Sequence, residues 1–123
     1  MSVFAIGDTH LSGAVNKPMD VFGGAWDNYT EKLKTNWEKT VSDTDTVVIT
    51  GDISWGMSMK EALCDFEFLA RLPGRKVIVK GNHDYWWDTV SKMTRILNKH
   101  GICGFEFIYN SCVSVQDYAL CAT

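Results

Sequence analysis

The sequence is poor in proline, histidine and long apolar runs, and it has no excess of basic residues. It contains 2 prolines and 3 histidines, and 12 basic against 15 acidic residues give a net charge of −3. No apolar stretch approaches the roughly 20 residues of a membrane span, so we expect no membrane partner. The negative net charge gives no electrostatic reason for nucleic-acid binding, so we do not expect a nucleic-acid partner.

The amino terminus shows no targeting signal. Met1 and Ser2 lead directly into an apolar run, with no basic region and no cleavable apolar segment. We therefore expect a cytoplasmic location.

The cysteines lack the spacing of a metal site. No Cys-x-x-Cys pair occurs among Cys64, Cys103, Cys112 and Cys121. A zinc site built on the last three is the weaker alternative, because tight ligand pairs are missing. Since nothing indicates secretion, we expect reduced thiols, mostly buried as small apolar groups, and no structural disulfide.

The composition is that of a soluble globular protein. Hydrophobic residues make up 46% of the chain, charged residues 22% and aromatic residues 12%, which supports a packed core. We expect one domain over residues 1–123, long enough to bury roughly two thirds of its unfolded surface.

Three short apolar runs each end in a glycine that precedes candidate metal ligands. The runs cover residues 3–7, 46–51 and 76–81, and their β-branched residues are typical of strands buried on both faces. The polar residues that follow them are Asp8 and His10, then Asp52, and finally Asn82, His83 and Asp84.

Segments of helical period separate these runs. Residues 26–41 and 86–99 are amphipathic, and a third helix is expected from the capping box Ser58-x-x-Glu61 to Pro73-Gly74. The alternating order predicts right-handed βαβ units, and hence an α/β fold with a mostly parallel sheet flanked by helices. Further strands are expected at residues 105–109, 113–115 and 118–122, with a turn at Asn110-Ser111.

A parallel sheet brings the carboxyl ends of its strands to one edge, where ligands of open α/β sheets bind. Asp8 and His10 are two apart, so on an extended backbone they point the same way and can bind one metal. The Asp52 carboxylate can bridge two cations. Asn82 offers a neutral amide oxygen as a further ligand.

His83 and Asp84 are the candidate catalytic residues. An imidazolium at His83 can protonate a leaving oxygen, and Asp84 can fix its tautomer by accepting the second ring N–H. Nitrogen and oxygen ligands without sulfur favour zinc, manganese or iron. Two such cations would attract a phosphate and lower the pKa of a bridging water for attack on phosphorus.

Each motif also has a local explanation. Asp8 and His10 could cap the next turn, Asp52 could be a helix N-cap, and Asp84 could cap a helix that begins near Trp86. Three separate local explanations would have to hold together at three successive strand ends, whereas one metal site explains all of these residues at once. We therefore favour the metal site. The long loop at residues 12–25 is interpreted either as a lid or as a simple insertion.

Asp8-x-His10, Gly51-Asp52 and Gly81-Asn82-His83-Asp84 resemble the first three signature blocks of calcineurin-like metallophosphoesterases. Residues 53–56 and 85–87 resemble a bacterial subgroup of predicted phosphohydrolases. The resemblance implies a four-layer α/β/β/α fold and hydrolysis of a small phosphate mono- or diester at a dinuclear metal site.

The same resemblance implies the roles of individual residues. Asp8, His10 and Asp52 would hold one of two divalent ions (Mn, Fe or Zn). Asp52 and Asn82 would hold the second ion. His83 would be the catalytic histidine, assisted by Asp84.

The chain departs from the family pattern in two places. Trp55 stands where many members have an aspartate, and the Gly-His-x-His block of the second half is missing, since His100 matches no such motif. We therefore expect a truncated metallophosphoesterase domain that forms a homo-oligomer through an exposed sheet edge. The alternative function is a catalytically impaired metal- or phosphate-binding fragment with a role in assembly.

Overall fold

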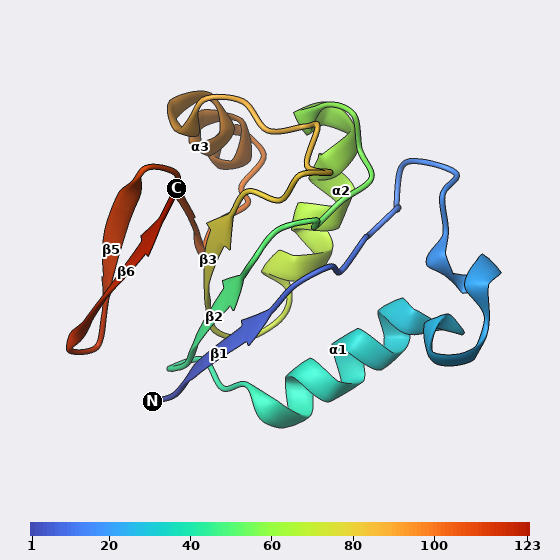
Figure 1. The fold of residues 1–123 in the computed structure, drawn as a ribbon, viewed down its shortest axis with the longest axis horizontal. Helices are drawn as coiled ribbons and strands as arrows, with labels where there is room; N and C mark the ends of the chain where they lie inside the picture. Colours follow the sequence, from blue (N-terminus) through green and yellow to red (C-terminus); the bar gives the residue numbers. More distant parts are fainter.

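Four parallel strands form the central sheet in a computed structural model that describes all residues 1–123. The strands are β1 (Val3–Ile6), β2 (Thr46–Ile49), β3 (Arg75–Val79) and β4 (Phe105–Ile108), and they follow one another across the sheet in sequence order. The helices between them are α1 (Tyr29–Thr40), α2 (Met59–Ala70) and α3 (Val90–Lys99) (Figure 1). The predicted α/β fold with a parallel sheet flanked by helices is confirmed.

All three helices cover the same face of the sheet. Right-handed crossovers between strands in sequential order place every connecting helix on one side. One buried cluster accordingly joins Trp37 of α1, Phe66 of α2 and Met93 of α3 to Ile49 and Ile78 of the sheet. None of the helices is long and apolar enough to cross a membrane.

The helix starts differ from the predicted ones at two places. Residues Gly24–Trp26 form a 3-10 turn, so α1 begins at Tyr29. Helix α3 begins after Thr89, whose side chain accepts the Lys92 amide, because Trp86 is buried in the preceding turn. The capping box at α2 is present, since Ser58 Oγ accepts the amide N–H of Glu61.

The last two strands form a separate antiparallel hairpin. Strands β5 (Ser111–Val115) and β6 (Tyr118–Ala122) lie on the side of the sheet away from the helices (Figure 1). A cleft of about 780 Å³ between hairpin and sheet is lined by Val48, Val79 and Leu120, among other residues. The turn that joins the two strands is Gln116-Asp117. The turn predicted at Asn110-Ser111 does connect β4 to β5, although Ser111 is already the first residue of β5.

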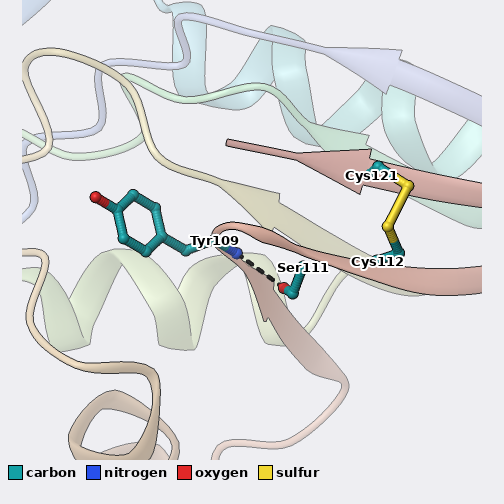
Figure 2. The surroundings of a disulfide bond; sticks show 4 residues. All are labelled: Tyr109, Ser111, Cys112 and Cys121. Atoms are coloured by element: carbon teal, nitrogen blue, oxygen red, sulfur yellow. Dashed lines mark hydrogen bonds between the residues drawn. A yellow bond between two sulfur atoms is a disulfide. The ribbon is translucent and has the colours of Figure 1, made fainter.

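The expectation of four reduced, mostly buried cysteines is wrong. Cys112 and Cys121 are directly opposite in the hairpin, with Cα atoms 4.1 Å apart, and form a disulfide (Figure 2). Cys103 is exposed and Cys64 is half-buried. A zinc site on Cys103, Cys112 and Cys121 is excluded here, because two of its three sulfur atoms are bonded to each other.

Candidate metal centre

The segment that follows β1 runs beside the segment that follows β2. The amides of Asp8 and His10 donate to the carbonyls of Gly51 and Asp52, each at 3.0 Å, and Leu11 continues the pairing. The Thr9 hydroxyl donates to the Ile53 carbonyl at 3.0 Å. These bonds bring the first two predicted ligand sets to one edge of the sheet.

Asp8, His10 and Asp52 all adopt left-handed backbone conformations. Their φ angles are 56°, 44° and 51°, and only three other non-glycine residues in the chain have a positive φ. Such conformations are unfavourable by roughly 1–3 kcal/mol and cluster at functional sites. The expectation that Asp8 and His10 lie on an extended backbone is therefore wrong, because β1 ends at Ile6.

The three side chains nevertheless converge. One ligand atom from each of Asp8, His10 and Asp52 lies within 4.8 Å of the others. Two atoms that bind the same ion at about 2.0–2.2 Å are at most roughly 4.4 Å apart, so small side-chain shifts complete the site. The Asp52 and His10 side chains are 11% and 15% exposed, whereas Asp8 is 72% exposed. The donor set fits one divalent cation, with one side open to solvent.

Asp52 is bound to His83 through both carboxylate oxygens. The His83 amide donates to Oδ1 at 2.9 Å, and Nδ1 of its ring lies 3.0 Å from Oδ2. Because an ionised carboxylate can only accept, Nδ1 carries a proton. Burial raises the pKa of Asp52, but the two hydrogen bonds and the charges of His83 and His10 outweigh it and hold that pKa below the usual value.

Asp84 does not contact the His83 ring, so the predicted tautomer-fixing hydrogen bond is wrong. Its buried carboxylate accepts the amide N–H groups of Asp52 and Ile53 at 2.8 Å and of Gly81 at 2.7 Å. The indole N–H of Trp86 donates to it at 3.1 Å. A buried carboxylate requires such donors, and these donors connect the ends of β2 and β3. Asp84 is not the helix cap of the local explanation either, since Thr89 caps α3.

Two glycines allow the ends of β2 and β3 to approach each other. Gly51 has a φ of 105°, and a Cβ atom on it would lie 2.5 Å from Cα of Gly81. A Cβ atom on Gly81 would overlap the amide nitrogen and Oδ1 of Asp52. Gly51 and Gly81 are therefore both required by this close contact of the two backbones. Gly51 is also required by the positive φ of its turn.

Asn82 is exposed, and its side chain makes no hydrogen bond within the chain. A second ion held by Asp52 and Asn82 stays a prediction. His100 lies outside the centre at the end of α3, where its Nδ1 is 2.9 Å from the Ile96 carbonyl and it caps the helix.

Sequence reasoning missed three residues that support the centre. Trp55 stacks on His10 with 4.9 Å between ring centroids. The Tyr29 hydroxyl donates to the His10 carbonyl at 3.0 Å. Asp65 of α2 accepts the Gly13 amide at 2.9 Å and the Ser54 hydroxyl at 2.5 Å. Tyr29 and Asp65 gave no signal in the sequence, because aromatic and acidic residues are usual in any amphipathic helix. Trp55 did give a signal, since it stands where many family members have an aspartate.

The loop at residues 12–25 contacts the centre and contains the 3-10 turns Met19–Phe22 and Gly24–Trp26. Its Lys17 places Nζ 5.2 Å from the centroid of the Trp55 ring. The contact places the loop beside the centre, and both interpretations, lid and simple insertion, stay predictions.

Comparison with known proteins identifies a family and a similar fold. Residues 1–121 match the calcineurin-like phosphoesterase family. No curated protein matches the chain. The chain is similar to the crystal structure of AQ665, a protein of unknown function from Aquifex aeolicus, with a TM-score of 0.57 and 22% sequence identity. The similarity covers 97% of this chain but 58% of AQ665, and at that identity it shows the fold alone.

Proposed function

The chain belongs to the calcineurin-like phosphoesterase family, and from this premise we propose that it takes part in metal-dependent hydrolysis of a small phosphate mono- or diester. The observation that carries the proposal is the convergence of Asp8, His10 and Asp52 beside the ring of His83. Metal-dependent hydrolysis of a phosphoester uses a cation beside a proton donor, and the candidates for both roles lie side by side at the strand ends.

In this proposal Asp8, His10 and Asp52 hold one divalent cation, and Asp52 and Asn82 hold a second. Manganese, iron and zinc all accept nitrogen and oxygen ligands of this kind. A bound cation supplies Lewis-acid chemistry, since it withdraws charge from phosphoryl oxygens and lowers the pKa of water. Cations also reverse the negative charge of the site, which would otherwise repel a phosphate.

His83 is the proposed general acid. Its Nδ1 is held by Asp52, and its Nε2 has no partner within the chain. While Nδ1–H donates to the Asp52 carboxylate, Nε2 also carries a proton in the imidazolium form of the ring. That proton can pass to the leaving oxygen of the ester. The side chain is 41% exposed, so the ring is accessible to a substrate.

Asp84 assists indirectly in this scheme. By accepting the amides of Asp52, Ile53 and Gly81, it holds the backbone from which Asp52 and His83 project. It is therefore proposed to position the catalytic groups without contact with the substrate.

A second candidate function is assembly through a catalytically impaired fragment. The strand β1 is an edge strand that pairs only with β2. Beside it lies an apolar cleft of about 400 Å³, lined by residues that include Val3, Tyr118 and Leu120. A second copy of the chain is the proposed occupant, and a homo-oligomer by light scattering that Val3→Lys dissociates would support it.

The cytoplasmic location stays a prediction. It rested on the lack of a targeting signal at the amino terminus, and the Cys112–Cys121 disulfide gives it no support, because such bonds are rare in the cytosol.

Turnover of p-nitrophenyl phosphate and of its bis ester tests the enzyme function. We expect turnover with manganese, iron or zinc that is lost in His83→Ala, while metal binding is retained. His100→Ala is the matched control, because that histidine lies outside the centre at the end of α3. Folded, metal-bound protein without turnover of either ester would favour the second candidate.

A further inference from the structure

Trp55 lies beside both histidines of the metal centre. Its indole ring stacks on the His10 ring, with 4.9 Å between centroids and 19° between planes. The His83 ring lies 5.5 Å away at an angle of 56°. The two imidazoles themselves are 6.4 Å apart. The indole therefore contacts the candidate ligand and the candidate acid together.

The His10 imidazole is enclosed by these contacts. The centroid of a second indole, that of Trp26, lies 6.3 Å from the centroid of the His10 ring. The Nε2 atom of His10 is 3.7 Å from Oδ1 of Asp8. The nitrogen lone pair that binds a metal lies in the plane of the ring. A stacked indole covers the face of the imidazole and leaves this edge available to the cation.

The backbone fixes Trp55 in this place. Its amide donates to the carbonyl of Leu11 at 2.8 Å, next to the left-handed His10 residue. Lys17 from the long loop lies over the indole. Trp55 thus connects the loops that follow β1 and β2 at the level of the metal ligands.

Packing alone does not account for a tryptophan here. Its Nε1 is the one buried side-chain nitrogen or oxygen that lacks a hydrogen-bond partner. An unpaired buried N–H is unfavourable, and phenylalanine would fill an aromatic position without it. Filling an aromatic position thus does not by itself explain why the larger indole stands here beside the two histidines.

We propose that Trp55 is a positioning residue that holds the His10 imidazole in its metal-binding orientation. The inference rests on the proposed metal-dependent function. Without the indole, the His10 ring gains rotational freedom that metal binding must remove again. Loss of a partner that orients a ligand typically weakens metal affinity 10–100-fold. We expect about a tenfold loss for Trp55→Leu, because stacking is weaker than a hydrogen bond.

The test measures Mn²⁺ affinity of the full chain by calorimetry for wild type, Trp55→Phe, Trp55→Leu and Trp55→Met. Phenylalanine retains an aromatic face and should bind within about twofold of wild type, whereas leucine and methionine should both bind about tenfold more weakly. Trp87→Leu is the matched control, since Trp87 packs on Phe107 and touches neither histidine.

A second readout is the proton NMR spectrum of the metal-free protein, with the three histidines assigned by single substitution. The ring protons of His10 should be shifted upfield by the indole in wild type and not in Trp55→Leu. Wild-type affinity in the folded leucine and methionine variants, or an unshifted His10 in wild type, overturns the proposal. Absence of turnover together with Trp55-dependent metal affinity would refute the proposed hydrolysis alone, whereas absence of Mn²⁺ binding to wild type would refute both.

Discussion

The ring nitrogen Nδ1 of His83 lies 3.0 Å from Oδ2 of Asp52, and the amide of the same histidine donates to Oδ1 of the same carboxylate. One aspartate thereby belongs to the cluster of candidate metal ligands and also holds the ring of the proposed proton donor. The turn that carries His83 comes from β3, while Asp52 follows β2, so their contact depends on the close approach of Gly51 and Gly81.

We predict that His83→Ala lowers kcat by about 10²–10⁴-fold, the range that a general acid typically contributes. Metal binding should be retained, with a loss of at most the roughly 10–100-fold typical of an outer partner, because His83 is not among the three clustered ligands but bonds one of them, Asp52. Steady-state kinetics and calorimetry measure the two quantities. A variant with wild-type kcat would contradict the role of His83.

We predict that Asp8→Ala and His10→Ala each weaken metal binding by more than the roughly 10–100-fold typical of outer partners of a ligand. Each change removes one of the three ligand atoms that cluster within 4.8 Å. Calorimetric titration with Mn²⁺ gives the affinities. The control Asp43→Asn removes an exposed carboxylate remote from the cluster and should leave the affinity unchanged.

We predict that Asp84→Asn destabilises the fold by roughly 1.5–3 kcal/mol, the range for hydrogen bonds to charged groups. The carboxylate of Asp84 now accepts hydrogen bonds from backbone N–H groups. In asparagine an NH₂ group would replace one carboxylate oxygen and could not accept them. Urea unfolding of the metal-free protein measures the change. Asp88→Asn is the control, because Asp88 is exposed and its pair with Lys92 should contribute less than about 1 kcal/mol. Equal stability of both variants would show that Asp84 does not hold the strand ends together.

The carboxyl of Asp65 predicts a pH dependence of stability. Burial raises its pKa above the ordinary value of 3.8, despite hydrogen bonds from Ser54, Gly13 and Cys64 that lower it. Because the folded state binds this proton more tightly than the unfolded state, the stabilising effect is full below pH 3.8 and is lost as pH rises through the folded pKa.

Asp65→Asn removes this titration and retains an acceptor for the Gly13 amide. Between about pH 4 and pH 7 the wild type should lose the stability that the protonated Asp65 contributes, whereas the variant should not. The free energy of unfolding of the variant minus that of wild type should therefore increase with pH. Urea unfolding in metal-free buffers across this range measures the difference. A difference that is constant or that falls with pH would be inconsistent with a raised pKa.

We predict that reduction of the Cys112–Cys121 bond lowers the stability of the fold by roughly 2–3 kcal/mol, since the bond closes a loop of about ten residues. Cys112→Ser should have the same effect, and Cys103→Ser should have none, because that thiol is free. Urea midpoints with and without reductant give the result. Identical midpoints would show that the two cysteines are not bonded in solution.

The order of strands and helices could be predicted from the sequence because β-branched runs and amphipathic segments are local signals. The candidate ligands could be predicted because each follows a strand that ends in glycine. Their left-handed conformations could not, since hydrogen bonds to Gly51 and Asp52, more than 40 residues away, fix Asp8 and His10.

Other features were missed for the same physical reason. The partners of Asp84 at Asp52 and Ile53 lie 31 or 32 residues away in the chain. The disulfide depends on a two-residue turn at Gln116-Asp117, which contains none of the glycine or asparagine typical of such turns.

The central claim is that Asp8, His10 and Asp52 together bind a divalent cation. Anomalous difference density from a crystal of the full chain soaked in Mn²⁺ tests it most directly. We predict a manganese peak within coordination distance of all three side chains, and a second peak beside Asp52 and Asn82 if the site is dinuclear. Saturating Mn²⁺ without a peak at these three residues would contradict the claim.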